Sequence, residues 1–267
     1  FTVAAEPGMI LNAKNPAAVG ERIDTAMRIA DVIFGALAPA AGIRSMSGSN
    51  GSCTTALFSG YDPNDPEQYH VYLETIAGGA GAHRDMDGQN GVQVHMTNTS
   101  NLPVEALEME FPLIMVKKYG LRPDSGGAGL YRGGLGIERV YEAVTDHVIY
   151  TGLGDRQRFE PWGIDGGHNG AGGCYDLTRS GQTESQRLTS KCTGLVMNRG
   201  DVVCVRTPGA GGWGDPKRRD VQKVLEDVLE GKVSPGAAAS EYGVALKRDK
   251  MLWTVDEEQT DVLRNTP

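Results

Sequence analysis

The chain has 267 residues, of which 39% are hydrophobic and 22% charged, with a formal net charge of −8 at pH 7. This composition is typical of a globular protein, and the length predicts one large domain or two small ones. The Lys and Arg residues are scattered and form no basic stripe that could follow a phosphate backbone, which disfavours nucleic-acid binding.

Glycine is the unusual residue, with 37 copies, roughly twice its average share of about 7%. The glycines are dispersed and follow no short repeat, so they predict tight turns and close backbone approaches rather than a collagen-like structure. The four cysteines form no CxxC pair, and we find neither a signal peptide nor an apolar run long enough for a membrane span. We therefore expect a cytoplasmic protein with free thiols and no membrane contact.

Residues 1–12 predict a strand followed by a Pro-Gly turn, and a long helix is predicted after them. Asn15 is a suitable N-cap with Pro16 in the first turn, and Pro39 is expected to end the helix. We expect its apolar stripe to face the core. The stripe consists of Ile23, Ala26, Met27, Ala30, Ile33, Phe34 and Leu37. Because the chain begins at Phe1 without an initiator Met, it is expected to be a processed product, a fragment or part of a longer protein.

The middle of the chain is rich in β-prone, alternating segments separated by turn residues. Strands are predicted at 54–58, 70–77, 92–96, 136–144, 147–153 and 201–206. Residues 104–119 fit either a strand or an amphipathic helix, and Pro112 favours extended structure.

The C-terminal part predicts helices that start at Asp215-Pro216 and Ser234-Pro235, then two short strands and a polar tail after Asp256. The basic run Lys217-Arg218-Arg219 is interpreted as a solvated face. The fold class is therefore predicted to be α+β, rich in β-structure with Gly-rich loops, with one long helix near the N-terminus and helices near the C-terminus. No linker is obvious, and a boundary between subdomains is possible near residue 120.

Three polar segments are candidate binding sites. The Gly-rich loop 78–91 carries His83 and Asp87 and could cradle an anion or contact a metal, or it could be an ordered surface loop. Asn98 and Glu105 lie in a second segment, where turn capping and surface charge are the alternative. In the third, Asp124 precedes a run of glycines and Arg132 could clamp a carboxylate or phosphate, or simply brace a neighbouring carboxylate.

General motifs do not identify a reaction. The sequence has no P-loop, no G-x-S-x-G elbow and no H-E-x-x-H, and its five His residues have no metal-ligand spacing on one helix face. These patterns therefore identify no catalytic residue and assign no metal site to this chain.

Taken in order, however, nine blocks resemble the hydantoinase B/5-oxoprolinase superfamily, which includes the matching subunits of ATP-dependent ketone carboxylases. They are Asn15–Val19, Arg28–Val32 with Gly35–Leu37, Gly78–Ala82 with Asp87-Gly88, Asn98–Glu105 with Glu108, Leu121–Gly136, Asp155-Arg156, Pro161–Gly163 with Gly166-Gly167, Thr207–Pro216 and Tyr242–Val244. The resemblance is to the C-terminal half of family members, so residues 1–267 are expected to be the C-terminal portion of a B-type subunit. Ala18 and Ala210 depart from it, where Pro and Gly are expected.

The resemblance implies an ATP-dependent hydrolase of cyclic amides such as hydantoin, 5-oxoproline or another lactam. A hydantoinase A-type partner subunit with ATP and Mg would phosphorylate the substrate. A divalent metal such as Zn or Mn is expected in the N-terminal half of the B-type subunit, which would be the second partner. The alternatives are the equivalent part of a ketone carboxylase and a non-catalytic scaffold. In all of these, His83, Asp87, Asn98, Glu105, Asp124 and Arg132 are candidates for substrate or phosphate contact.

Overall fold

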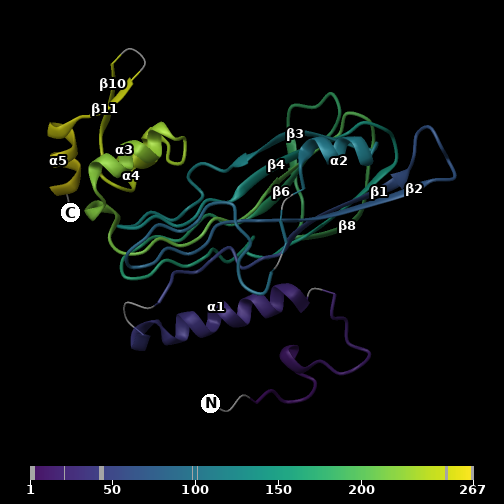
Figure 1. The fold of residues 1–267 in the computed structure, drawn as a ribbon, viewed down its shortest axis with the longest axis horizontal. Coiled ribbons are helices and arrows are strands. Elements are labelled where there is room, and N and C mark those ends of the chain that lie inside the picture. Colours follow the sequence, from purple (N-terminus) through teal and green to yellow (C-terminus); the bar gives the residue numbers. More distant parts are fainter. Residues whose placement is uncertain are drawn as a thin grey trace.

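The computed structural model describes residues 4–20, 22–41, 45–97, 99–100, 102–249 and 252–265. Strands outweigh helices, the long helix α1 (Arg22–Ala41) lies near the N-terminus, and shorter helices lie near the C-terminus (Figure 1). The predicted fold class is confirmed. In the described ranges no helix is long and apolar enough to cross a membrane.

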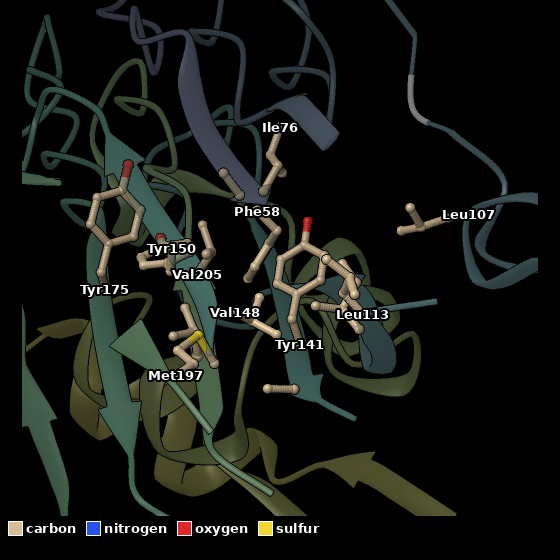
Figure 2. Close-up of a cluster of buried hydrophobic side chains, with 14 of the residues drawn as sticks. Phe58, Ile76, Leu107, Leu113, Tyr141, Val148, Tyr150, Tyr175, Met197 and Val205 are labelled. Carbon is tan, nitrogen blue, oxygen red and sulfur yellow. The ribbon is translucent and has the colours of Figure 1, made fainter. Parts of the chain in front are cut away.

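Two antiparallel sheets pack face to face around the main core. The first sheet has the order β2 (Tyr69–Ile76), β1 (Thr54–Tyr61), β5 (Val148–Leu153), β8 (Lys191–Met197). The second has the order β3 (Ile114–Leu121), β4 (Ile137–Ala143), β9 (Val202–Arg206), β6 (Cys174–Thr178), β7 (Ser185–Arg187). Side chains from both sheets meet in the core (Figure 2), where the rings of Phe58 on β1 and Tyr141 on β4 are 4.8 Å apart.

Most of the predicted strands are confirmed, namely those near 54–58, 70–77, 136–144, 147–153 and 201–206. Their alternating polarity matches the alternating burial of a sandwich strand, as in β4. Residues 92–96 are not a strand, and only Val92 pairs, in an isolated bridge with Gly78. The segment 104–119 divides into helix α2 (Val104–Glu110) and strand β3, with Pro112 between them. Residue 120, near the possible subdomain boundary, lies inside β3.

The Gly-rich segments form a bundle of extended chains beside the sandwich, toward the C-terminal helices (Figure 1). Segment 207–214 lies among the others and bonds to them through the backbone; for example, Gly79 donates to the Pro208 carbonyl and Gly127 to the Ala210 carbonyl. A Cβ on Gly133 would lie 1.9 Å from the Ala210 carbonyl oxygen. Glycine is therefore required for chains to approach this closely, as its abundance predicts.

The prediction for α1 was wrong in its bounds and in its orientation. The helix begins at Arg22 and continues through Pro39 to Ala41. Of the apolar stripe, only Met27 is buried, whereas Ile33 and Leu37 are about half exposed, at 49% and 51%. The helix instead buries the carboxylates of Asp24 and Asp31 against the protein. Periodicity identified the stripe but could not show which face of the helix the protein covers. Residues 4–12 contain the short 3₁₀-helix η1 (Ile10–Asn12) and no strand.

The C-terminal unit has its own small core. It contains η3 (Pro216–Arg218), α3 (Val221–Leu229), α4 (Pro235–Ser240), the hairpin β10 (Leu246–Asp249) and β11 (Leu252–Val255), and α5 (Glu257–Asn265). Ser234 caps α4, as the sequence predicts. Asp215 caps only the three-residue η3, whereas the predicted apolar helix begins at Val221 as α3 and is capped by Asp220. The segment predicted as a polar tail is instead the helix α5. Its Thr260 is buried and bonds to the backbone of Ala245, which attaches the helix to the C-terminal unit.

Candidate functional site

Two of the predicted contact residues, Asp87 and Arg132, belong to one ion-pair network. The Asp87 carboxylate accepts hydrogen bonds at 2.7 Å from both terminal nitrogens of Arg219 and from the backbone N–H of Arg132. Asp227 on α3 accepts from Arg219 at 2.9 Å and from the Arg132 Nε at 3.3 Å. Arg132 also donates to Asn90 and to the Gly133 carbonyl. The network joins the Gly-rich loop 78–91 to the C-terminal unit.

The charged groups of this network are buried. Arg132 and Arg219 are each only 2% exposed and Asp227 is 4% exposed, so the paired charges have little access to water. Burial raises the pKa of the Asp87 carboxyl, but the hydrogen bonds and charge of Arg219 outweigh it and hold this pKa below its usual value. The interpretation of the basic run as a solvated face was wrong for Arg219. Substrate contact by Asp87 and Arg132 stays a prediction.

The other predicted residues are dispersed. His83 is partly buried and its backbone pairs with Met46. Asp124 is exposed, has a φ of +58° and accepts a hydrogen bond from the Ser234 backbone. Glu105 is exposed on α2, and Asn98 lies outside the described residues.

A second cluster, centred on Asp31 of α1, was not predicted as a site. The Asp31 side chain is 3% exposed, and one of its oxygens lies 3.0 Å from His95 Nε2. The other oxygen accepts from Arg156 at 2.6 Å and from Arg28 at 3.2 Å. Arg28 also donates to Asp155 at 3.0 Å. The cluster thus joins α1 to two loops that are distant in the sequence.

Backbone conformations around Asp31 are unusual. His95 and Arg156 have φ values of 35° and 57°, a region that residues with side chains rarely occupy. A Cβ on Gly51, which has a φ of +48°, would lie 2.6 Å from the Asp31 carboxylate. Such strain is maintained where the surrounding structure fixes it, often at functional sites. Burial raises the pKa of Asp31, but the His95 hydrogen bond and the charge of Arg156 hold this pKa below its usual value.

A signal for this cluster was present in the sequence. Arg28, Asp31, Asp155 and Arg156 all lie in blocks that carry the family resemblance, but the contact between these blocks is tertiary. His95 had no such signal, because it lies outside every block.

A divalent metal does not fit the described residues. No group of three or more His, Cys, Asp or Glu side chains with suitable geometry occurs within these ranges. The buried pair of Asp31 and His95 is unsuitable because Arg156 and Arg28 bond to the second carboxylate oxygen of Asp31 and would repel a cation.

Two of the cavities that α1 helps to line differ in character. The larger, about 790 Å³, lies at the C-terminal end of α1 and includes Trp213, Arg84 and Arg218 in its lining, but none of the predicted site residues. The smaller, about 220 Å³, lies against the Asp31 cluster. Its lining consists of Arg28, Asp155, Arg156, Gln157, Arg158, Phe159 and Ser190.

Comparison with known proteins places these features in a family context. An uncharacterized protein of Methanocaldococcus jannaschii is 40% identical over 99% of this chain and 45% of its own length. The putative B subunit of a D-/L-hydantoinase from a Pseudomonas species is 30% identical over 98% of the chain and 43% of its own length. The chain therefore spans less than half the length of these relatives.

Solved structures agree. The ATP-dependent caprolactamase from Pseudomonas jessenii matches 98% of this chain and 46% of its own with a TM-score of 0.82 and 29% identity. A nucleotide-free acetone carboxylase shares the fold alone, with a TM-score of 0.67 and 22% identity over 82% of this chain and 33% of its own. The family model described as hydantoinase B/oxoprolinase matches residues 1–216. From this match, which covers most of the sequence, we conclude that the chain belongs to the hydantoinase B/oxoprolinase family.

Proposed function

We propose that this chain is the C-terminal part of the B-type subunit of an ATP-dependent enzyme that hydrolyses cyclic amides. Hydantoin, 5-oxoproline and other lactams are the substrate class. The observation that carries the proposal is the structural match to the ATP-dependent caprolactamase over 98% of the chain, supported by the hydantoinase relative. In this proposal an A-type partner subunit, with ATP and Mg, phosphorylates the substrate in the cytoplasm.

The second proposed partner is the remaining half of the B-type subunit, and the outward face of α1 supports it. This face exposes apolar side chains along the helix, including Val32 at 66% and Ile33 at 49%. A helix that buries carboxylates and exposes isoleucines is suited to contact a further protein surface. The relatives have more than half of their length outside the matched region, enough to supply that surface.

The described residues contribute positioning rather than metal chemistry. Since no metal fits them, we propose that the divalent ion, Zn or Mn, is held by the companion half and assign no chemical step to it here. Asp87 and Arg132 are paired with Arg219 and Asp227, which would fix the Gly-rich loop 78–91 relative to a bound substrate. His83, Asn98, Glu105 and Asp124 remain candidates for direct contact.

A ketone carboxylase is the second candidate, and the fold shared with acetone carboxylase favours it. A non-catalytic scaffold is the third candidate. Asp87 and Arg132 form their hydrogen bonds with other groups of the protein, and this favours a structural role for them.

The test is activity of the complete complex. The chain would be purified gently with all co-purifying chains, identified by native mass spectrometry, and supplied with ATP and either lactams or ketones with bicarbonate. We expect ATP hydrolysis to depend on a lactam or hydantoin. Dependence on ketone and bicarbonate would instead establish the carboxylase. A complex whose turnover is unchanged by His83→Ala and by Asp124→Ala would favour the scaffold, and a chain that purifies alone would contradict the multi-subunit proposal.

A further inference from the structure

The smaller cavity, about 220 Å³ beside the Asp31 cluster, has the character of an anion site. Three arginines line it: Arg28 from α1, and Arg156 and Arg158 from the loop that follows β5. Asp155 is the only carboxylate of the lining, and it is already bonded to Arg28. The cavity is therefore more positive than its own acidic residues can balance.

Arg156 provides a donor that the described protein does not use. The residue is 8% exposed, and its two terminal nitrogens donate to the Glu160 carbonyl at 3.0 Å and to Asp31 at 2.6 Å. Its Nε is buried and has no hydrogen-bond partner within the described ranges. A buried charged donor without an acceptor is costly, so such groups in folded proteins nearly always have a partner.

The balance of charges around the cavity also favours a bound anion. Arg28 and Arg156 lie close enough that, after burial, the charge of Arg28 is the largest influence lowering the pKa of Arg156. Asp31 and Asp155 balance these two arginines. Arg158 is exposed, forms no ion pair with any described residue and lies over the Phe159 ring, 5.5 Å from its centroid. One further negative charge would balance the group.

We propose that this cavity binds a small oxyanion, a phosphate or a carboxylate group, with Arg156 Nε and the Arg158 guanidinium as its charged donors. Ser190 and Gln157, which also line the cavity, supply neutral donors. Guanidinium groups are the side chains best suited to both kinds of oxyanion. The inference stands on the cavity alone and does not depend on the proposed function.

The test measures the NMR signal of the Arg156 Nε–H group. The 267-residue chain, labelled with ¹⁵N, is titrated with inorganic phosphate and separately with acetate, at an ionic strength kept constant with chloride. Loss of one Arg Nε–H signal in Arg156→Lys assigns the Arg156 signal. We expect that signal to shift saturably with at least one anion, and the anion that acts identifies the phosphate or the carboxylate class.

Two charge-matched variants separate this site from general attraction of anions. Arg158→Gln should weaken binding about tenfold, the effect of losing one charge-assisted hydrogen bond. Arg199→Gln also removes one positive charge, but from an exposed position. Ser190 of the cavity precedes β8 and Arg199 follows it, so Arg199→Gln should leave the affinity unchanged. The inference is overturned if neither anion shifts the Arg156 signal saturably, or if both variants weaken binding equally.

Discussion

At the scale of single residues, buried arginines are paired with buried carboxylates. Asp227, 4% exposed, is shared by Arg132 and Arg219. Asp227→Asn should lower the free energy of unfolding by about 3–5 kcal/mol, because it leaves a buried guanidinium charge uncompensated. Urea unfolding measures the change.

The neighbouring Glu226 supplies the control for this substitution. It is exposed on the same helix, and Glu226→Gln should change the free energy of unfolding by less than about 0.5 kcal/mol. Equal effects of the two substitutions would show that α3, rather than the ion-pair network, is sensitive to charge.

Acid sensitivity follows from the same contacts. The pKa of Asp87 is lower in the folded protein than its usual 3.8, so the ionised carboxylate stabilises the fold above that pH. This stability is lost as the pH falls below 3.8 and through the folded pKa. Asp87→Asn should therefore flatten the decline of unfolding free energy with acidification below about pH 4. A variant that keeps the full acid slope of the parent would assign that slope to other carboxylates, such as Asp31.

Residue patterns alone predicted part of this chemistry. That Arg132 could brace a carboxylate was one of two interpretations of its turn, and the structure supplies Asp227 as that carboxylate. The burial of Arg219 could not be predicted, because its neighbours Lys217 and Arg218 make the run look solvated and its partner Asp87 is 132 residues away.

At the scale of elements, the Gly-rich bundle should be the part least tolerant of added volume. Gly133→Ala would place a methyl group 1.9 Å from the Ala210 carbonyl oxygen. We expect a loss of about 3 kcal/mol in the free energy of unfolding, since backbone on both sides must move. Urea denaturation of the variant tests this.

Gly120 on β3 is the matched control, because a methyl group added there would have nothing within 4 Å of it. Gly120→Ala should be neutral or slightly stabilising. If Gly133→Ala were equally harmless, Gly133 and the Ala210 carbonyl would have to lie farther apart than this contact requires.

At the scale of the whole molecule, α1 is expected to join this chain to its companion half. Val32→Ser should hardly change the stability of the chain alone, because Val32 is already 66% exposed, but should weaken association with the companion half. Pull-down of the co-expressed halves measures the association. Val196→Ser, on β8 at 46% exposure, is the control and should leave it intact. Undiminished association of Val32→Ser would place the interface elsewhere.

The sequence by itself determined the β-rich class, most sandwich strands, the helix cap at Ser234, and the family, because each depends on local patterns of polarity, turn chemistry or ordered motifs. Only the tertiary structure decided which face of α1 is covered, which glycines touch, and how Asp31 meets Arg156. These depend on contacts between segments far apart in the sequence, such as Asp31 and Arg156, which are 125 residues apart, and no local pattern specifies such partners. Long-range pairing of buried charges is thus the feature that the sequence alone could not supply.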